Sequence, residues 1–158
     1  MIRELQRSDV RACAAILGRL SDWFGDPVSN ANYVAALDHS PVFFASVRAV
    51  RGFLVLEKHD HGSAEILVMG VDPEWHRNGL GRALVAAAEE WCKKEGVRWL
   101  HVKTRGPSTY DDAYERTRQF YFAMGFEVLY ESMTEWGPRD AALVLVKHMA
   151  CADDEAAR

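Results

Sequence analysis

A short polar loop near the middle of the chain joins a strand-like segment to a helix-like segment. Residues 64–71 are almost all apolar after Glu65, which is typical of a strand covered on both faces. Asp72 and Pro73 end this run. The apolar residues beyond the loop recur at helical spacing and are Leu80, Ala83, Leu84, Ala87 and Trp91. The chain must therefore adopt a fold in which a buried strand leads directly into an amphipathic helix.

The loop itself has the features of an anion-binding site. Gly79 and Gly81 lack side chains, so an anion can approach the backbone at the start of the helix. The N–H groups of a first helical turn have no partner within the helix, and the helix dipole favours negative charge there. Arg77 and Arg82 can add charge-assisted contacts to phosphate. We expect a pyrophosphate site; the alternative is an ordinary helix start in which glycine permits close packing.

Two better-known phosphate motifs do not fit this loop. No Lys-Ser or Lys-Thr pair follows the glycines, so it is not a P-loop. The third glycine of the dinucleotide fingerprint is also missing.

The hydrophobic pattern of the whole chain predicts an α+β fold. A mixed central sheet of about seven strands, with helices on both faces, is expected because helices and antiparallel strand pairs alternate irregularly. The expected strands are residues 2–6, 42–50, 53–58, 64–71, 97–104, 126–133 and 142–148, and the expected helices begin at Val10, at Ser29 or Asn30, at Leu80 and at Tyr114. Residues 1–150 are expected to form a single domain, and residues 151–158 a frayed tail.

Two motifs in this order resemble those of the GNAT superfamily of acyl-CoA-dependent N-acetyltransferases. The family has a Val-x-Pro strand end followed by Arg/Gln-x-x-Gly-x-Gly/Ala, here Val71–Pro73 and His76–Gly81. It also has a later helix that ends in Phe-Tyr-x-x-x-Gly-Phe, here Phe120–Phe126. The resemblance extends over nearly the whole chain. It implies the GNAT fold and acetyl transfer from acetyl-CoA to a primary amine in a ternary complex, with no metal.

The resemblance also implies roles for individual residues. The cofactor-binding residues would be Met69, Val71, His76, Arg77, Asn78, Gly79, Leu80, Gly81, Arg82 and Tyr114. Backbone N–H groups near Met69 and Val71 would hold the pantetheine arm and polarise the thioester carbonyl. His76 replaces the family's Arg or Gln, and Tyr114 replaces a frequent Asn. We expect the first replacement to weaken cofactor binding without abolishing it.

Two residues are candidates for proton transfer. Glu65 would be the general base for the amine, because a free amine is mostly protonated at neutral pH. Tyr121 would be the general acid that protonates the departing CoA thiolate. The alternatives are a solvated carboxylate at a strand entrance and a core aromatic residue. His101 and His148 are second choices for the base.

Composition narrows the classes of partner. The chain has 158 residues, 49% hydrophobic and 27% charged, as expected for a globular domain, and its net charge of −4 argues against bulk nucleic-acid binding. Three dispersed cysteines suggest reduced thiols, and no apolar run is long enough for a membrane helix. We expect a cytoplasmic enzyme whose partners are acetyl-CoA and an amine, without nucleic acid or membrane. The oligomeric state stays open, although the resemblance makes a homodimer possible because the family often dimerises.

Other interpretations remain at this point. His59 and His61 flank a turn and are expected to be solvated rather than bound to metal. A catalytically silent CoA-binding sensor or interaction protein is the main alternative to an enzyme. A nucleotide-binding protein is the third.

Overall fold

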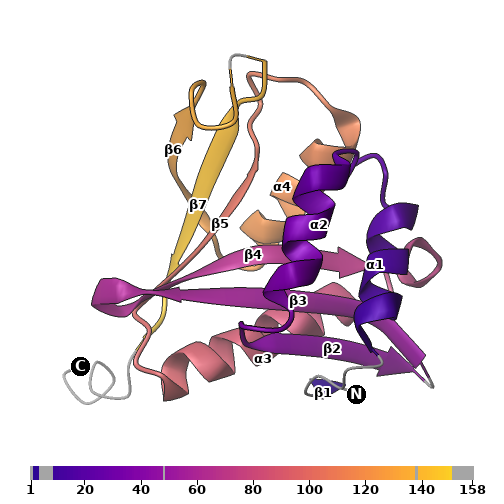
Figure 1. Cartoon of the computed structure of the whole chain (residues 1–158). Coiled ribbons are helices and arrows are strands. Elements are labelled where there is room, and N and C mark those ends of the chain that lie inside the picture. Colours follow the sequence, from indigo (N-terminus) through magenta and orange to yellow (C-terminus); the bar gives the residue numbers. More distant parts are fainter. Residues whose placement is uncertain (1, 4–8, 48, 138, 151–158) are drawn as a thin grey trace. The chain divides into compact units, whose positions relative to one another are not determined.

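The computed structural model describes residues 2–3, 9–47, 49–137 and 139–150, and for residues 2–3 and 44–47 it describes the backbone alone (Figure 1). The expected tail at 151–158 and residues 4–6 of the first expected strand lie outside the described residues. The chain divides into two compact units. The first contains Met1–Lys58 and Ile66–Trp91, and the second contains His59–Glu65 and Cys92–Arg158.

Helices and strands alternate irregularly along the chain, as expected. The elements in chain order are β1 (Ile2–Arg3), α1 (Val10–Arg19), α2 (Pro27–Ala36), β2 (Val42–Val47), β3 (Ala49–His59), β4 (Ser63–Val71), α3 (Leu80–Lys94), β5 (Trp99–Arg105), α4 (Asp112–Ala123), β6 (Glu127–Ser132) and β7 (Ala142–His148), with single 3-10 turns η2 (Asp60–Gly62) and η3 (Pro73–Trp75). Among the described residues, β1 has two residues and each of the other strands has six or more.

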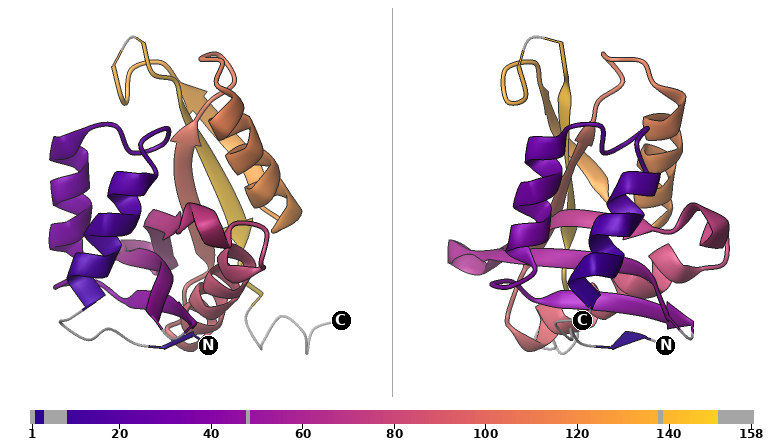
Figure 2. Two further views of the ribbon diagram at one scale, coloured as in Figure 1. Left: turned by 90° about the vertical axis from the view of Figure 1, so that its right-hand side faces the viewer. Right: turned by 45° about the vertical axis from the view of Figure 1, so that its right-hand side comes forward.

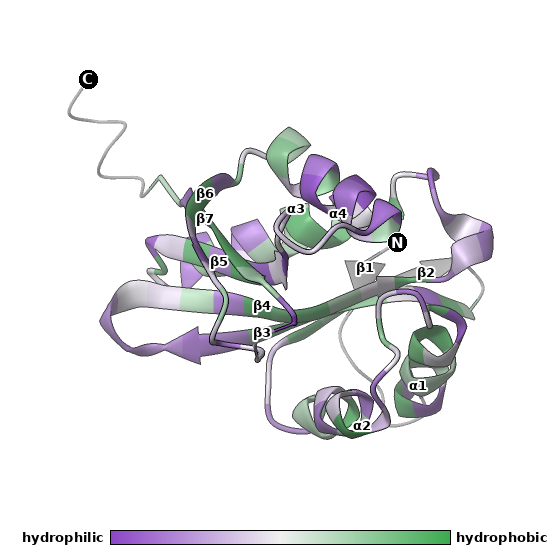
Figure 3. Cartoon of the chain, turned by 90° about the horizontal axis from the view of Figure 1, so that it is seen from above, coloured by the Kyte–Doolittle hydropathy of each residue, from purple (hydrophilic) through white to green (hydrophobic). Residues whose placement is uncertain are grey.

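The first unit is a sheet with helices on both faces. Its strands follow the order β1-β2-β3-β4, and β2 pairs antiparallel with β1 and with β3. Helices α1 and α2 cover one face and α3 the other (Figures 2 and 3). Two glycines permit this close packing. A Cβ atom on Gly70 would lie 3.2 Å from Leu20 of the α1 C-cap, and one on Gly52 would lie 3.3 Å from Leu84 of α3.

A continuous apolar core lies beneath α1. Its members, all buried, include Cys13, Ile16, Leu17, Leu20, Leu37, Phe53, Val55 and Val68. Strand β3 is hydrophobic along its middle and hydrophilic toward His59 (Figure 3), so its two ends have different environments. The apolar end lies in this core, whereas the polar end leads into the turn before β4.

The second unit is built on three strands and one helix. The strands follow the order β5-β7-β6, and β7 pairs antiparallel with both neighbours. Helix α4 lies along β5, where Arg118 donates a 2.7 Å hydrogen bond to the carbonyl of Arg105. Along β5, burial alternates residue by residue, so Trp99, His101 and Lys103 share the more exposed face.

Three sequence expectations about local structure were wrong. Helix α4 begins at Asp112 rather than at Tyr114, because the Asp111 carboxylate accepts hydrogen bonds from the N–H groups of Ala113 and Tyr114. Helix α2 begins at Pro27 rather than at Ser29 or Asn30, because the Asp26 carboxylate accepts hydrogen bonds from the N–H groups of Val28 and Ser29. The turn expected at Arg51-Gly52 lies inside β3. Gly52 serves close packing there: a Cβ atom on it would also lie 3.2 Å from the carbonyl oxygen of Gly70.

Candidate functional site

The loop between β4 and α3 is anchored by a buried carboxylate. The Asp72 side chain is 1% exposed and accepts hydrogen bonds from Arg19 at 2.7 Å and from Arg51 at 3.2 Å. It also accepts a 3.3 Å bond from the N–H group of Glu74, and its own N–H group donates to the carbonyl of Arg51. Asp72 therefore joins α1, β3 and η3 at the point where the loop leaves the sheet.

Beyond this anchor, the loop adopts a backbone conformation that only some residues tolerate. Arg77 has φ +65° and Gly79 has φ +77°. The second value favours glycine, and a Cβ atom on Gly79 would meet nothing within 4 Å in the described protein. Space is therefore open beside Gly79. The first turn of α3 begins there, since the N–H group of Ala83 donates to the carbonyl of Gly79.

The candidate phosphate-binding side chains point to solvent. Arg77, Asn78, Gly79 and Arg82 are exposed, whereas Leu80 and Gly81 are half-buried. Within the described ranges, the guanidinium groups of Arg77 and Arg82 make no ion pair or hydrogen bond. The start of α3, a helix of fifteen residues, thus combines the positive end of the helix dipole with an open backbone and two cationic side chains.

His76 follows the η3 turn, and its ring reaches back to the strand before the loop. Its Nε2 lies 2.8 Å from the carbonyl oxygen of Val71, so this nitrogen carries the proton and donates it. The ring also meets the edge of Trp23 at 6.1 Å between centroids. In turn, Asn78 donates a hydrogen bond to the His76 carbonyl. His76 therefore fixes the loop against the end of β4.

Met69 and Val71 lie on the less buried side of β4. Along the strand, Ile66, Val68 and Gly70 are buried, while Met69 and Val71 are half-buried. Burial thus alternates along this half of β4. The expected function of their N–H groups stays a prediction.

Tyr121 is buried in the second unit. It is 4% exposed and packs edge-to-face against Phe120 and Phe126. Burial raises the pKa of its hydroxyl well above the usual range, so the group stays neutral. Among the described residues this hydroxyl has no hydrogen-bond partner. It is both a core aromatic and an uncommitted proton donor.

Tyr114 lies against a cation rather than at an open surface. The guanidinium carbon of Arg105 lies 5.1 Å from its ring centroid. Arg105 is itself bound by Asp140 at 2.6 Å and by Asp111 at 3.4 Å. Asp111 also caps α4, accepting from the N–H groups of Ala113 and Tyr114. The expected contact between Tyr114 and a cofactor stays a prediction.

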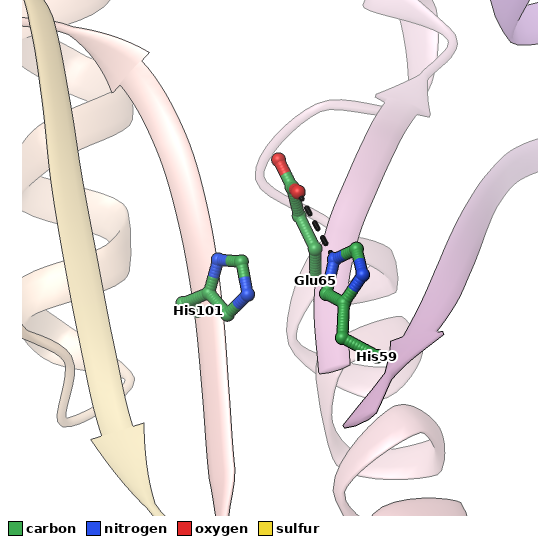
Figure 4. Close-up of side chains that lie close together, drawn as sticks. All are labelled: His59, Glu65 and His101. Carbon is green, nitrogen blue, oxygen red and sulfur yellow. Dashed lines mark ion pairs between the residues drawn. The ribbon is translucent and has the colours of Figure 1, made fainter. Parts of the chain in front are cut away.

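Glu65 is nearly buried, unlike a solvated carboxylate at a strand entrance. Its side chain is 12% exposed, with Oε2 lying 3.5 Å from Nε2 of His59 and Oε1 lying 3.7 Å from Nζ of Lys103. The rings of His59 and His101 stack at 5.5 Å, and all three side chains point into the same space (Figure 4). Glu135 completes the group, with a 2.9 Å contact to Lys103.

The charges in this group perturb one another. Burial lowers the pKa of His101, with Glu65 opposing the shift and His59 and Lys103 adding to it. The hydrogen bond to Glu135 raises the pKa of Lys103 despite partial burial. The cluster therefore favours a charged lysine and a neutral His101.

These side chains line an open pocket of about 800 Å³ in the second unit. Apolar residues of β6 and β7, among them Leu129, Tyr130 and Val146, form one part of its wall, and Arg98 and Trp99 lie on another part. Sequence reasoning assigned no role to Lys103 or Glu135. The alternation along β5 puts Lys103 on the same face as His101 and was the available signal. No comparable signal pointed to Glu135, which lies in a loop.

Comparison with known proteins identifies the family. A family model described as an acetyltransferase (GNAT) domain matches residues 30–128, and this stretch runs through both units. The chain belongs to the GNAT family of acetyltransferases. The predicted family is thereby confirmed.

Solved structures show that the fold is that of GNAT proteins. An acetyltransferase of the GNAT family from Desulfovibrio desulfuricans is similar to this chain, with a TM-score of 0.84 and 19% identity, and the match covers 95% of this chain and 99% of that one. An aminoglycoside 6'-N-acetyltransferase complexed with coenzyme A is also similar, with a TM-score of 0.74 and 15% identity over 95% and 97% of the two chains. The predicted α+β GNAT fold is thus confirmed.

A curated relative has a higher sequence identity to this chain than these structures, but over a shorter stretch. The mycothiol acetyltransferase of Nocardiopsis dassonvillei is 35% identical over 78 residues, which cover 49% of this chain and 22% of that protein. The chain matches between 17% and 28% of the length of such relatives. Among the described helices, none is both long and apolar enough to cross a membrane.

Proposed function

We propose that the protein transfers the acetyl group of acetyl-CoA to a primary amine, with both substrates bound in a ternary complex. The observation that carries this proposal is the start of α3 in a chain of the GNAT family. Gly79 has open space beside a positive φ, and Arg77 and Arg82 are uncommitted cations next to it. The aminoglycoside acetyltransferase with bound coenzyme A supports this choice of cofactor.

Pyrophosphate binding is proposed for the backbone N–H groups of residues 79–82, with Arg77 and Arg82 adding charge. His76 would act on this site indirectly, since its ring already donates to the end of β4. Cofactor contacts for Met69, Val71, Asn78, Leu80, Gly81 and Tyr114 belong to the same proposal.

The proposed reaction balances as follows. The amine nitrogen attacks the thioester carbonyl carbon, forming a C–N bond, and the C–S bond then breaks. Glu65 accepts the proton that the amine loses, and Tyr121 hydrogen-bonds to the departing thiolate and donates a proton to it. An unperturbed thiol has a pKa near 8.5, so full transfer from a buried tyrosine requires a thiolate that is desolvated as well. The products are an acetamide and free CoA, and solvent then takes the proton from Glu65 and returns one to Tyr121, which restores both groups.

We further propose that residues 1–150 act as a single cytoplasmic acetyltransferase domain, without nucleic acid or membrane, that forms a homodimer. The family match through both units supports a single domain. Cys13 and Cys92 form no disulfide within the described part of the chain, which is consistent with a reducing compartment. The exposed apolar side chains of Val128, Leu129 and Tyr130 on β6 are candidates for the dimer contact. Light scattering on the whole chain measures the oligomeric state.

The first test is thermal unfolding of the protein with acetyl-CoA, CoA and ATP in parallel. At about 100 times its dissociation constant a ligand stabilises by about 2.7 kcal/mol, or about 5–10 °C for a chain of this size. We expect this shift with both CoA forms and not with ATP. A shift with ATP alone would favour a nucleotide-binding protein, and no shift at all would refute the cofactor site.

A panel of amines assayed by thiol release then tests catalysis. With an accepted amine, Glu65→Gln should lower kcat by about 10²-fold and leave the acetyl-CoA shift unchanged. Glu127→Gln, at an exposed carboxylate of β6, is the matched control. A wild-type protein that binds CoA but acetylates nothing would point to the sensor alternative.

A further inference from the structure

His59, Glu65 and His101 have the composition and spacing of a metal-ligand set. Their ligand atoms all lie within 4.8 Å of one another, and Nε2 of His59 lies 3.5 Å from Oε2 of Glu65. In a tetrahedral zinc site with bonds of about 2.0–2.2 Å, neighbouring ligand atoms are about 3.3–3.5 Å apart. The His59–Glu65 pair already has this separation. The third ligand must approach by about 1.5 Å at most, which is within reach of side-chain rotation.

The chain brings these groups together from three strands that follow one another in sequence, β3, β4 and β5. The η2 turn, with φ +60° at His61 and +75° at Gly62, reverses the chain so that His59 and Glu65 face each other. His101 comes from β5 and stacks on His59 (Figure 4). All three belong to the second unit, and they line its open pocket. A fourth coordination position would therefore be accessible to water or to another ligand.

Neighbouring side chains orient the carboxylate. Lys103 lies 3.7 Å from Oε1 of Glu65, which leaves Oε2 toward His59. Lys103 is also held by Glu135 at 2.9 Å. Lys103 thus lies between two carboxylates, and Glu65 keeps one oxygen on the side of the imidazoles. Such partners behind the ligands are a common feature of metal sites.

His101 also has a nitrogen without a role. Its Nδ1 is buried, and among the described residues it has no hydrogen-bond partner. A buried polar atom without a partner is uncommon and requires an explanation. The ring therefore has coordinating capacity that the protein itself does not use.

We propose that His59, Glu65 and His101 form a binding site for a divalent transition-metal ion such as Zn²⁺, with Co²⁺ as its spectroscopic substitute. Two imidazoles and one carboxylate suit these ions, whereas Mg²⁺ and Ca²⁺ prefer sites built from oxygen alone. From the sequence we considered only His59 and His61 as metal ligands, and we expected them to be solvated. In the structure the second imidazole is His101, from a distant strand.

The site has a consequence for catalysis that rests on the proposed function. A carboxylate oxygen that coordinates a metal cannot at the same time accept the proton of an amine. Metal binding would therefore inhibit acetyl transfer by occupying the base. It would act as a regulator of the reaction and take no part in it.

The test is titration of the metal-free, untagged whole chain with Co²⁺, followed by its visible absorption, and with Zn²⁺ in competition with a chromophoric chelator. We expect one ion per chain at this site, with no competition from equal concentrations of Mg²⁺ or Ca²⁺. His59→Ala and His101→Gln should each weaken binding by at least 10-fold. His61→Ala, at a neighbouring pocket residue outside the set, is the matched control and should bind like wild type.

Binding by the His59→Ala and His101→Gln variants as tight as that of wild type would overturn the proposal, as would an equal loss in His61→Ala. Thermal unfolding of each metal-free variant checks that it folds. If His101→Gln does not fold, His59→Ala still decides, because the His59 side chain is 37% exposed. The binding measurement uses neither acetyl-CoA nor amine, so its failure leaves the proposed function intact. Conversely, if the protein transfers no acetyl group, the metal site can still be tested by the same titration.

Discussion

Replacing Gly79 with alanine separates ligand binding from backbone strain. At φ +77° an alanine costs about 1–2 kcal/mol, and the stiffer unfolded chain returns about 0.4–1 kcal/mol. The net loss of stability is therefore about 1 kcal/mol, or about 2–4 °C in Tm for a chain of this size. The new methyl group meets no protein atom within 4 Å, so it projects into the space proposed for pyrophosphate. We expect the Kd for acetyl-CoA, measured by calorimetry, to rise at least 10-fold, or about 1.4 kcal/mol.

Gly96 offers the control for this substitution. It has φ +68°, a Cβ atom on it would also meet nothing within 4 Å, and it follows the other end of α3. Gly96→Ala should therefore lose about as much stability as Gly79→Ala while binding acetyl-CoA like wild type. Equal affinities in the two variants would refute the assignment of the phosphate site. A far larger loss of stability in one of them would refute the strain argument.

Three further predictions concern buried groups. Tyr121→Phe keeps the packed ring and removes only the hydroxyl. The kcat should therefore fall by about 10²-fold, with little change in stability or in the affinity for acetyl-CoA. An unchanged kcat would exclude Tyr121 as the general acid. Burial and Asp9 raise the pKa of Cys13 to about 12, above its ordinary 9.0. The unfolded thiol ionises first, so stability should decline as pH rises from about 9 toward 12, and Cys13→Ala should lessen that decline in urea titrations. Asp72→Asn loses charge-assisted bonds to Arg19 and Arg51 and should destabilise by about 1.5–3 kcal/mol in urea; a change below 0.5 kcal/mol would mean that the loop is held elsewhere.

Most of the fold was predictable because its signals are local. Helix α3 begins at Leu80 as expected, since apolar residues at helical spacing and a preceding glycine coincide there. Strand β7 has the expected bounds for a similar reason. The errors came from residues with two uses. Gly52 lies between two expected strands but serves packing inside one strand, and Pro27 begins a helix that was expected to start at Ser29 or Asn30.

The candidate site was predictable only in part. The loop at Arg77–Arg82 is visible in sequence because glycine, arginine and a helix start are contiguous there. The surroundings of Glu65 are not, because His101, Lys103 and Glu135 reach it through strand pairing and a loop that no local pattern fixes. For His76 the position in the motif was predictable, but the contact that its side chain makes was not. Its hydrogen bond to Val71 depends on where the loop turns back.

Gly52 and Gly70 have a mechanical consequence for the loop. Their missing side chains make the sheet locally thin, so α1 and α3 can both sit close to it. The start of α3 is then near the strand that leads to it, and the connection can be short and tightly curved. A methyl group at Gly52 would press on Leu84, one turn along from Leu80, and push the helix outward. The path of the exposed loop is thus set in part by two glycines inside the sheet, which allow the helices to pack closely against it.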